Sequence, residues 1–321
     1  FKTMKSYNKE PDKLYFGIPS GSLQEQTTRL INAAGWPIEP SRRYDVVSPE
    51  DPRIIWRIRD RKEMAKLVAM GVVDAGITGR DYIFDTGQEN DVEPVGDFIY
   101  SKKTNQPSRL ALVADASIDN VDACKGQPIY TELLRLTRAK LREVCDFNKT
   151  DLARLNLSEG KTEAKISDGM AVAITEIVET GDTLKANGLR ELTALFTSYP
   201  QLIANGDALK ETWKREAVEM VRIGIDAQLQ TEKDPQVMIT MDVPSERVTD
   251  VTKLLPSCVA PTISQLTEPG WVSLSVLTGT KKSKLIPLKL LSSQLGVRGI
   301  VVTTPKMVYD QSLLKPKRFD S

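Results

Sequence analysis

Short apolar segments alternate with amphipathic segments over the first part of the chain. Residues 13–20 (KLYFGIPS) are predicted to form a buried strand, and residues 22–25 have the capping-box pattern that opens a helix. A further strand, helix and strand are predicted at residues 54–59, 62–70 and 75–78. Such alternation predicts an α/β domain with a largely parallel sheet, whose ligands gather at the carboxyl ends of the strands.

A second α/β set follows the first. Strands are predicted at residues 110–114, 128–131 and 170–178, and a helix at residues 132–143. Residues 146–160 are polar and are predicted to form a loop. A chain of 321 residues is longer than one hydrophobic core usually supports, so two or three domains are expected.

A long amphipathic helix at residues 212–228 leads to a charged stretch at residues 230–235, which is the best candidate for a domain boundary. Beyond it the pattern predicts strand, helix, strand, strand, helix and strand, at residues 236–243, 245–255, 262–266, 271–277, 283–294 and 298–303. This βαββαβ order is that of the ferredoxin-like fold.

Composition narrows the choice of partners. The 44 Lys and Arg residues nearly balance the 43 Asp and Glu residues, and the formal net charge is +1. General binding to nucleic acid or anionic membranes needs a basic excess, so any phosphate must be held locally. No apolar run approaches the roughly 18 residues of a membrane span, and residues 1–13 have no secretory apolar core. We therefore expect neither nucleic acid nor a membrane as a partner.

Histidine is absent from the chain. Its absence removes the usual general base, the Ser–His–Asp and Cys–His arrangements and nearly every catalytic zinc site. Cys124, Cys145 and Cys258 are too few and too scattered for a disulfide framework, so a reducing compartment is expected. Whatever chemistry occurs must proceed without imidazole.

The passage at residues 171–189 (AVAITEIVETGDTLKANGL) carries the clearest chemical pattern. An apolar strand delivers Glu176 and Glu179 to its end, and residues 180–183 (TGDT) must turn before a helix that starts near Leu184. Backbone N–H groups and two hydroxyls at such a turn suit a terminal phosphate, while carboxylates can accept hydrogen bonds from sugar hydroxyls. The alternative is a strand, an N-cap threonine and two solvated acids, which is the commoner outcome for an isolated Thr-Gly-x-Thr.

The wider pattern resembles the ATP phosphoribosyltransferase family in its long form, the first enzyme of histidine biosynthesis. The family signature is matched by Glu163, Gly169, Ala171, Ile174, Ile177, Thr180, Gly181, Thr183 and Leu184, with Glu176 standing where Asp is usual. The resemblance also covers residues 17–25, 71–81, 130–141, 254–266 and 270–277. It extends in order over nearly the whole chain.

This resemblance implies an α/β fold with a bilobal, periplasmic-binding-protein-like catalytic core and a C-terminal ferredoxin-like (ACT-like) domain. The implied domains are a discontinuous first lobe (residues 12–107 and 195–229), a second lobe (108–194), a regulatory domain (230–310) and two tails (1–11 and 311–321).

The implied reaction is attack by N1 of the adenine of ATP on C1 of phosphoribosyl pyrophosphate, giving N1-(5-phosphoribosyl)-ATP and pyrophosphate. A displacement of this kind needs alignment, Mg²⁺ and neutralisation of the leaving group more than it needs a proton-transfer residue. We expect Mg²⁺ to be held mainly by the substrate phosphates rather than by protein side chains. Histidine is the implied feedback inhibitor.

The resemblance implies three sets of site residues. The phosphoribosyl pyrophosphate site is expected at Glu176, Glu179, Thr180, Gly181, Asp182, Thr183 and Leu184. The ATP site is expected at Ser20, Gly21, Ser22, Leu23, Arg59, Gly79 and Asp81. The allosteric histidine site is expected at Asp242, Cys258, Thr262, Leu277 and Gly299.

Two of these expectations have alternatives in the residues themselves. Asp81 could simply cap the helix that follows the strand at residues 75–78. Arg57, Arg59 and Arg61 alternate along one strand face, which is either solvated or directed at phosphates; the resemblance favours Arg59 for the second role.

Three residues depart from the family pattern. Ser20 replaces a Lys in the first loop, and Tyr130 and Arg135 replace other residues in the second lobe. Either Arg135 and Arg138 restore positive charge to the cleft, or Tyr130 crowds it. The alternative to an active transferase is therefore a weakened or inactive regulatory paralogue, and a plain solute-binding protein is disfavoured. We further expect a homo-oligomer, from dimer to hexamer, in the cytoplasm, or in an organelle if a segment before Phe1 is removed.

Overall fold

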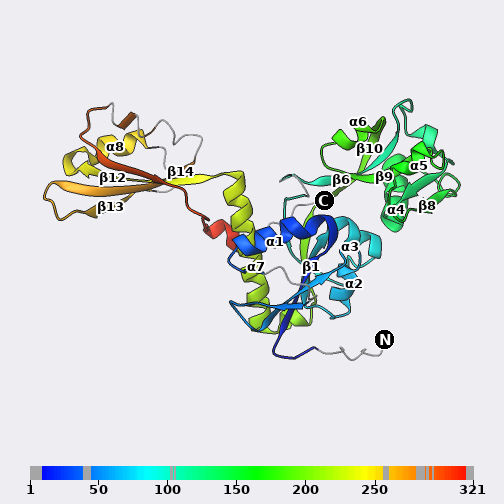
Figure 1. Ribbon diagram of the computed structural model, residues 1–321, viewed down its shortest axis with the longest axis horizontal. Helices are drawn as coiled ribbons and strands as arrows, with labels where there is room; N and C mark the ends of the chain where they lie inside the picture. The colour runs from blue at the N-terminus through cyan, green and yellow to red at the C-terminus, as the bar shows by residue number, and fades with distance from the viewer. Residues whose placement is uncertain are drawn as a thin grey trace. The chain divides into compact units, whose positions relative to one another are not determined.

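The computed structural model describes residues 9–38, 45–101, 104, 106–255, 260–279, 286, 289–290 and 293–315. The chain divides into two compact units. The first unit comprises Phe1–Ile225 with Leu314–Ser321, and the second comprises Asp226–Leu313 (Figure 1).

The first lobe of the first unit is built on a six-stranded sheet with the order β2-β3-β1-β4-β11-β5. Its strands are β1 (Leu14–Pro19), β2 (Asp45–Val47), β3 (Ile54–Arg59), β4 (Ala75–Gly79), β5 (Glu93–Asp97) and β11 (Pro200–Ala204). Its helices are η1 (Gly21–Leu23), α1 (Gln24–Ala33), α2 (Met64–Ala69) and α3 (Arg80–Thr86), and η3 (Ala208–Lys210) precedes α7.

The central strand β1 is buried along its whole length, as the apolar run predicts for a strand covered on both faces. Gly17 of β1 pairs with Gly76 of β4, and Met64 of α2 packs directly onto both. A Cβ at Gly17 would lie 2.4 Å from the Met64 sulfur, and one at Gly76 would lie 2.7 Å from it. Glycine at both positions therefore leaves room for the Met64 side chain between α2 and the sheet.

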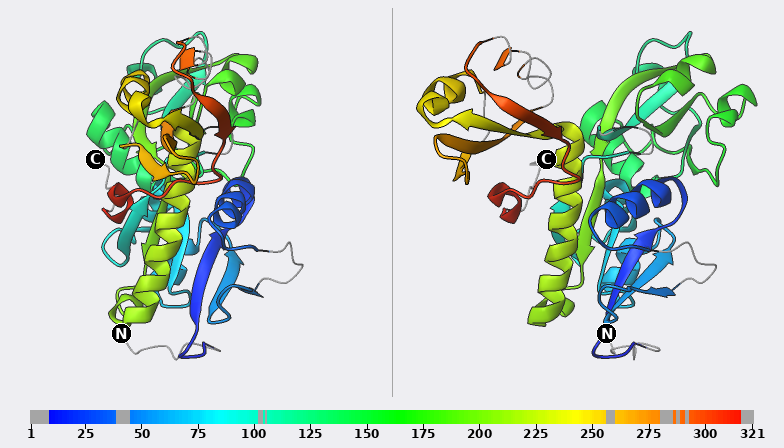
Figure 2. Two further views of the ribbon diagram at one scale, coloured as in Figure 1. Left: turned by 90° about the vertical axis from the view of Figure 1, so that its left-hand side faces the viewer. Right: turned by 60° about the vertical axis from the view of Figure 1, so that its left-hand side comes forward.

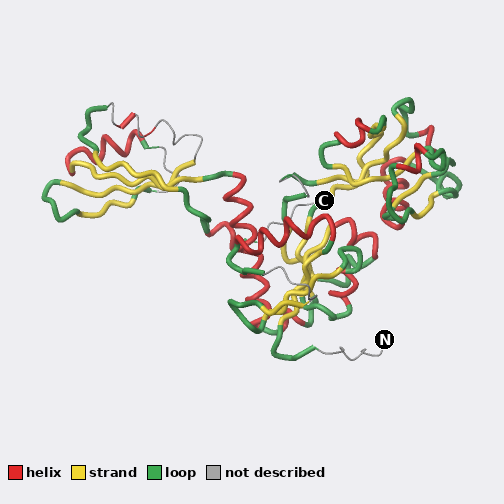
Figure 3. The backbone as a smooth tube through the Cα atoms, viewed as in Figure 1, coloured by secondary structure: helices red, strands yellow, loops and turns green. Residues whose placement is uncertain are grey.

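The second lobe has a five-stranded sheet with the order β10-β6-β9-β7-β8. Its strands are β6 (Ser108–Asp115), β7 (Ile129–Thr131), β8 (Leu155–Leu157), β9 (Ala173–Val178) and β10 (Leu189–Ser198). Its helices are η2 (Asp122–Cys124), α4 (Leu134–Cys145), α5 (Ala164–Ser167) and α6 (Asp182–Ala186). Figure 3 shows the strands of each sheet as a separate group.

The chain passes from the first sheet to the second after β5 and returns between β10 and β11. β10 stays in the second sheet to Ser198, beyond the predicted end of this lobe at residue 194. The strands predicted at residues 13–20, 54–59 and 75–78 pair in parallel as β3-β1-β4, as expected. Both sheets are mixed all the same, because β2 and β11 in the first sheet and β6 in the second run antiparallel to their neighbours.

The second unit has a four-stranded antiparallel sheet with the order β13-β14-β12-β15. Its elements are β12 (Gln236–Pro244), η4 (Ser245–Arg247), α8 (Val248–Leu254), β13 (Thr262–Gln265), β14 (Trp271–Gly279), β15 (Arg298–Thr303) and η5 (Gln311–Leu314), which lies in the predicted C-terminal tail. Most of the helix predicted at residues 283–294 lies outside the described residues. The strand order is that of the ferredoxin-like fold, and the predicted α/β fold class is confirmed.

Alternate residues of β12 and β14 are buried, so each strand presents one face to a core and one face outward. The core contains Val251 and Leu255 from the α8 segment, together with Ile286 and Leu290. The opposite face of this sheet is called the open face below.

Helix α7 (Thr212–Lys233) begins in the first unit and carries the chain into the second, as the long helix in Figure 2 shows. Although α7 has 22 residues, neither it nor another described helix is apolar enough to cross a membrane.

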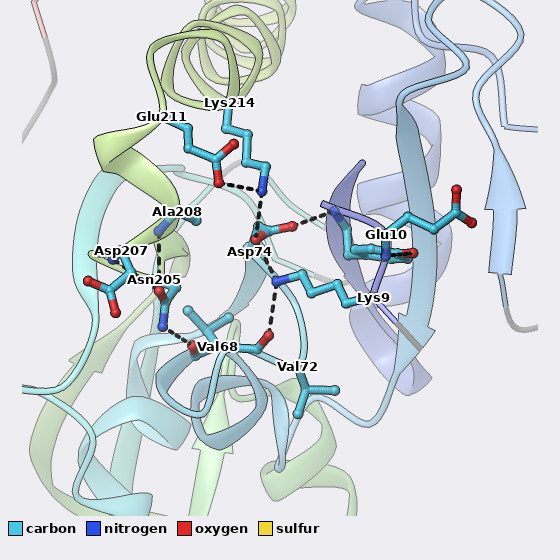
Figure 4. A network of polar contacts seen from close by, with 12 residues as sticks. Lys9, Glu10, Val68, Val72, Asp74, Asn205, Asp207, Ala208, Glu211 and Lys214 are labelled. Carbon is cyan, nitrogen blue, oxygen red and sulfur yellow. Dashed lines mark hydrogen bonds and ion pairs between the residues drawn. The ribbon is translucent and has the colours of Figure 1, made fainter. Parts of the chain in front are cut away.

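The start of α7 is held by a buried polar network around Asp74, shown in Figure 4. The Asp74 carboxylate accepts hydrogen bonds from Lys9 Nζ at 2.5 Å and from the Tyr15 N–H at 2.8 Å. Lys214 Nζ of α7 lies 3.9 Å away from the same carboxylate and 2.8 Å from Glu211. Burial lowers the pKa of Lys9, and Asp74 opposes that shift. One carboxylate therefore joins the N-terminal segment, β1 and α7.

We predict that Asp74→Asn lowers the free energy of unfolding of the first unit by about 3 kcal/mol, because it leaves two poorly solvated ammonium groups without their shared counter-ion. Urea unfolding would measure this loss. The matched control is Asp207→Asn, which breaks a solvent-exposed pair with Lys210 and should leave the stability nearly unchanged. Equal losses in the two variants would contradict the role given to Asp74.

Candidate functional site

A cleft of about 370 Å³ lies between the two lobes of the first unit. The first lobe contributes Ser22, Leu23, Arg61, Gly79, Asp81 and Tyr82. The second lobe contributes Ser108, Leu110, Glu132, Leu133, Thr175, Glu176, Ile177 and Glu179. The segments that connect the lobes contribute Tyr100, Ser101, Ser198, Tyr199 and Pro200. The cleft therefore lies where the chain crosses from one sheet to the other.

Asp81 is a buried acid in the first turn of α3, and its side chain is tied to the return crossing. Its carboxylate accepts a hydrogen bond from Ser198 Oγ at 2.6 Å, and its own N–H donates to the same hydroxyl at 3.2 Å. A Cβ at Gly79 would lie 2.1 Å from Asp81 Oδ1, so glycine leaves room for the carboxylate. Burial raises the pKa of Asp81. The acid thus both orders the crossing and lines the cleft.

Arg61 lines the cleft although it was not among the expected ATP-site residues. Its Nε donates to Tyr82 Oη at 3.0 Å, and a Cβ at Gly21 would lie 2.1 Å from its Nη1. Of the described residues that line the cleft, Arg61 is the positively charged one. The alternating arginines predicted a cationic face but did not distinguish this arginine, which follows the end of β3, from the other two.

Four of the seven expected ATP-site residues line the cleft, namely Ser22, Leu23, Gly79 and Asp81. Ser20 lies just before η1, and its N–H donates to the Arg59 carbonyl at 2.8 Å. The Arg59 guanidinium lies 2.9 Å from Asp45. Ser20, Gly21 and Arg59 are not among the lining residues.

A second cavity, of about 250 Å³, lies on the expected phosphoribosyl loop. It is lined by Glu163, Glu176, Ile177, Val178, Glu179, Thr180, Gly181, Thr183, Leu184 and Asn187. Six of the seven expected residues are in this set, and the seventh, Asp182, is exposed. Gly181 has a φ of +83°, so the turn requires glycine. Glu176, Ile177 and Glu179 line both cavities, which are therefore adjacent.

The hydroxyl of Thr180 has a partner within the loop, because it donates to Asp182 Oδ2 at 2.8 Å. Leu184 is 5% exposed and anchors the short helix α6 to the apolar core below it. The loop is therefore fixed at its helical end, while its threonines face the cavity.

Several acidic side chains line the cleft. Glu176 is half-buried, and this burial, followed by the charges of Glu163 and Glu132, raises its pKa to about 7. Ser101 Oγ donates to Glu179 Oε2 at 3.0 Å, and Arg109 Nη1 donates to the Glu179 carbonyl at 3.1 Å. Acids held in this way can accept hydrogen bonds from ligand hydroxyls or bind a cation.

Tyr130 and Arg135, the two departures from the family pattern in the second lobe, lie outside the lining of the cleft. Tyr130 packs against the apolar cluster around Ala111, Val113 and Ile174 and is not among the lining residues. The Arg135 guanidinium pairs with Glu89 at 2.7 Å, so it does not add charge to the cleft. Tyr130, Arg135 and Arg138 are therefore not among the lining residues, and neither crowding by Tyr130 nor added charge from Arg135 and Arg138 has support in the lining of the cleft.

Comparisons with known proteins assign the family. The model for ATP phosphoribosyltransferase matches residues 60–225, and the model for its C-terminal domain (HisG, C-terminal domain) matches residues 234–304. The chain belongs to the ATP phosphoribosyltransferase family. Its activity is that of a pentosyltransferase of histidine biosynthesis, and nothing in these comparisons favours the inactive alternative.

Curated relatives match over most of their length. ATP phosphoribosyltransferase 1 of Geobacter sulfurreducens is 36% identical over 290 residues, covering 90% of this chain and 96% of the relative. ATP phosphoribosyltransferase of Solidesulfovibrio magneticus is 37% identical over 292 residues, covering 90% and 95%. Among solved structures, the ATP phosphoribosyl transferase (HisG:HisZ) complex from Thermotoga maritima covers 66% of this chain and 98% of its own, with a TM-score of 0.53 and 20% identity. That last likeness concerns the fold alone.

The residues expected to bind histidine share the open face of the second unit. Asp242, Thr262 and Leu277 lie at outward positions of β12, β13 and β14, and a Cβ at Gly299 would lie 3.7 Å from Asp242. Cys258 lies outside the described residues. Asp242 is 3.7 Å from Arg298, whose guanidinium stacks on Trp271. An incoming cation would therefore compete with Arg298 for Asp242.

We predict a pH-dependent difference between the wild type and Glu176→Gln. The pKa of Glu176 is raised from 4.5 to about 7, so the folded state holds an additional proton between these pH values. The contribution of Glu176 to the free energy of unfolding therefore falls as the pH rises through this range. Between pH 4 and pH 8 the variant should gain roughly 2–3 kcal/mol relative to the wild type in urea unfolding.

The matched control for this prediction is Glu159→Gln, since Glu159 is exposed. A pH-dependent difference of the same size in this control would show that the effect is not specific to Glu176. A constant difference for Glu176→Gln would show that its carboxyl titrates normally.

Proposed function

We propose that the two adjacent cavities bind phosphoribosyl pyrophosphate and ATP. The single observation that carries this proposal is the placement of residues 176–184 around a cavity that shares Glu176 and Glu179 with the interlobe cleft. The 5-phosphate would lie in the turn at residues 180–183, the ribose beside the two acids, and ATP on the first-lobe side near Ser22 and Asp81. Such a pose would bring adenine N1 and ribose C1 together within the cleft.

In this reaction the bond from adenine N1 to C1 forms as the bond from C1 to the pyrophosphate oxygen breaks. The electron pair of that bond leaves with the pyrophosphate. Charge on C1 rises in the transition state, and the carboxylates of Glu176 and Glu179 would stabilise it electrostatically. Arg61, which lines the cleft, would bind a phosphate oxygen. No general base is required for the bond-forming step, which agrees with a chain that lacks histidine.

Mg²⁺ fits this site as an ion carried by the substrate. Within the described part of the chain, no three acids, cysteines or histidines are close enough together to hold a metal ion. The acids that line the cleft can instead bind water of a hydrated ion. The ion, when bound, would neutralise charge on the pyrophosphate.

The direct test is release of pyrophosphate from phosphoribosyl pyrophosphate in the presence of ATP and Mg²⁺, followed with a coupled colour assay. Turnover that depends on both substrates and is lost with EDTA is the expected result. Pyrophosphate release without ATP would indicate hydrolysis and would contradict the transfer reaction. We also propose a homo-oligomer between dimer and hexamer and a cytoplasmic location, for which light scattering and cell fractionation are the measurements.

For the loop, we predict that Thr180→Ala combined with Thr183→Ala weakens binding of phosphoribosyl pyrophosphate by roughly 1–3 kcal/mol, since each hydroxyl would satisfy a phosphate oxygen. The loss at Thr180 should be the smaller one, because its hydroxyl already has a partner in Asp182. Titration calorimetry on the single and double variants measures both. Thr193→Ala, at a half-buried position of β10 that lines neither cavity, is the control. Unchanged affinity in the double variant would remove the phosphate from this loop.

We also propose that free histidine binds the open face of the second unit and inhibits turnover. The supporting observation is that Asp242, Thr262, Leu277 and Gly299 share one face of a ferredoxin-like sheet. We predict that Asp242→Ala raises the histidine concentration needed for half-inhibition by about tenfold. A loss of affinity of this size is expected when an ammonium group loses a charged partner.

Uninhibited turnover of Asp242→Ala should stay near that of the wild type, because Asp242 does not line the cleft. A dose–response curve with Asp250→Ala as an exposed control would measure the effect. Equal inhibition of the three proteins would place the histidine site elsewhere.

A further inference from the structure

Beside the cleft, the end of α3 in the first lobe and the start of α4 in the second lobe make reciprocal polar contacts. The Arg135 guanidinium in the first turn of α4 donates to the Glu89 carboxylate at 2.7 and 3.3 Å, and it also donates to the Phe84 carbonyl near the end of α3. In return, Asp85 Oδ1 of α3 accepts a hydrogen bond from the Leu136 N–H at 2.9 Å. Each helix end therefore receives its partner from the other lobe.

The helix dipoles explain why these partners matter. An arginine in the first turn of a helix faces the positive end of the dipole, which is unfavourable. Glu89 and the carbonyl end of α3 offset that cost for Arg135. An acid at the start of a helix is favourable, but the acid that serves α4 is Asp85 of the other lobe. Burial raises the pKa of Asp85, and its hydrogen bonds to the α4 backbone oppose that rise.

The contact is adjacent to the cleft. Glu132 and Leu133 directly precede α4, and both line the cleft. The Glu132 carboxylate also pairs across the lobes with Lys62 Nζ at 2.9 Å. An apolar cluster of both lobes fills the space between, made of Tyr82, Leu110, Leu133, Leu136 and Phe196. Three of its members, Tyr82, Leu110 and Leu133, are cleft residues. The position of the start of α4 therefore determines how the two faces of the cleft stand opposite each other.

We propose that Arg135 and Asp85 are positioning residues that hold the lobes in the arrangement that assembles the substrate cleft. This inference rests on the proposed function only in taking the cleft as the substrate site. The Arg135 side chain is 54% exposed, so its ion pair is of the modest, solvent-screened kind. The ion pair therefore favours the assembled arrangement of the lobes by a modest free energy, and the separated arrangement stays accessible.

Kinetics distinguish this role from a contribution to folding. When only a fraction of the protein has the binding arrangement, apparent affinities fall in proportion to that fraction. Arg135→Gln should therefore raise KM for both substrates by about 3–5-fold, the range of an exposed ion pair. Its kcat should change by less than about twofold, because bound substrate restores the assembled arrangement. Arg142→Gln is the matched control, since it removes the same charge from an exposed position of the same helix.

Exchange of the two charges tests the pairing itself. Arg135→Glu alone should raise KM more than Arg135→Gln, because it places two acids opposite each other. Combining it with Glu89→Arg should return KM to within about twofold of the wild type, since the ion pair is restored with its signs reversed. A structural role without specific pairing would show no such rescue.

Hydrogen exchange of the free protein gives a readout that needs no activity. The Leu136 amide should exchange at least tenfold faster in Asp85→Ala, where its acceptor is removed, and Asp85→Asn should restore part of the protection. This arm holds even if the protein fails to turn over the proposed substrates. The proposal is overturned if Arg135→Gln and Arg142→Gln have equal KM values, if charge exchange gives no rescue, or if Leu136 exchange is unchanged in Asp85→Ala.

Discussion

The buried hydrogen bond between Ser198 and Asp81 is the contact on which the arrangement of the first unit depends. Ser198 ends the last strand of the second sheet, and Asp81 lies in the first turn of a helix of the first lobe. The Ser198 hydroxyl donates a hydrogen bond to the Asp81 carboxylate and accepts one from the Asp81 N–H. Both residues also line the cleft, so the same hydrogen bond fixes the crossing of the chain and part of the cleft wall. A change at this bond would alter the fold and the site together.

The charge of the cleft sets a second constraint. Asp81, Glu132, Glu176 and Glu179 face it, with Arg61 as the cationic residue among the described lining side chains. Polyanionic ligands would be repelled by such a surface unless a cation or backbone N–H groups met their phosphates. The division of our proposed site into a loop for the phosphate and acids for the sugar follows from that electrostatic requirement.

Much of the fold could be predicted from periodicity. Strands β3 and β15 begin and end as predicted, because their apolar residues form short, well-bounded runs. Strands β10 and β11 were missed. β10 has two irregularities in its pairing with β6, so its buried residues do not alternate in the simple way that a sequence pattern detects. β8 has three residues and falls within the segment predicted as a loop.

The site divides in the same way. The loop at residues 180–183 was predictable because one continuous segment supplies the glycine with positive φ, the hydroxyls and the neighbouring acids. Arg61, Glu132 and Ser198 were not assigned to the cleft, because they come from separate segments that only the folded chain brings together. A sequence pattern can locate a local cradle, whereas the opposite wall of a cleft depends on tertiary structure.

The position of β11 in the first sheet has a consequence for the order in which the chain can fold during synthesis. β11 lies between β4 and β5, which have no pairing with each other without it. The ribosome completes β5 at Asp97, but β11 begins only at Pro200, after the whole second lobe has been made. Until then β4 has an open edge and β5 has no place in its sheet. The second lobe, encoded without interruption, can fold while the first lobe waits, and closure of the first sheet is the late, non-local step of biogenesis.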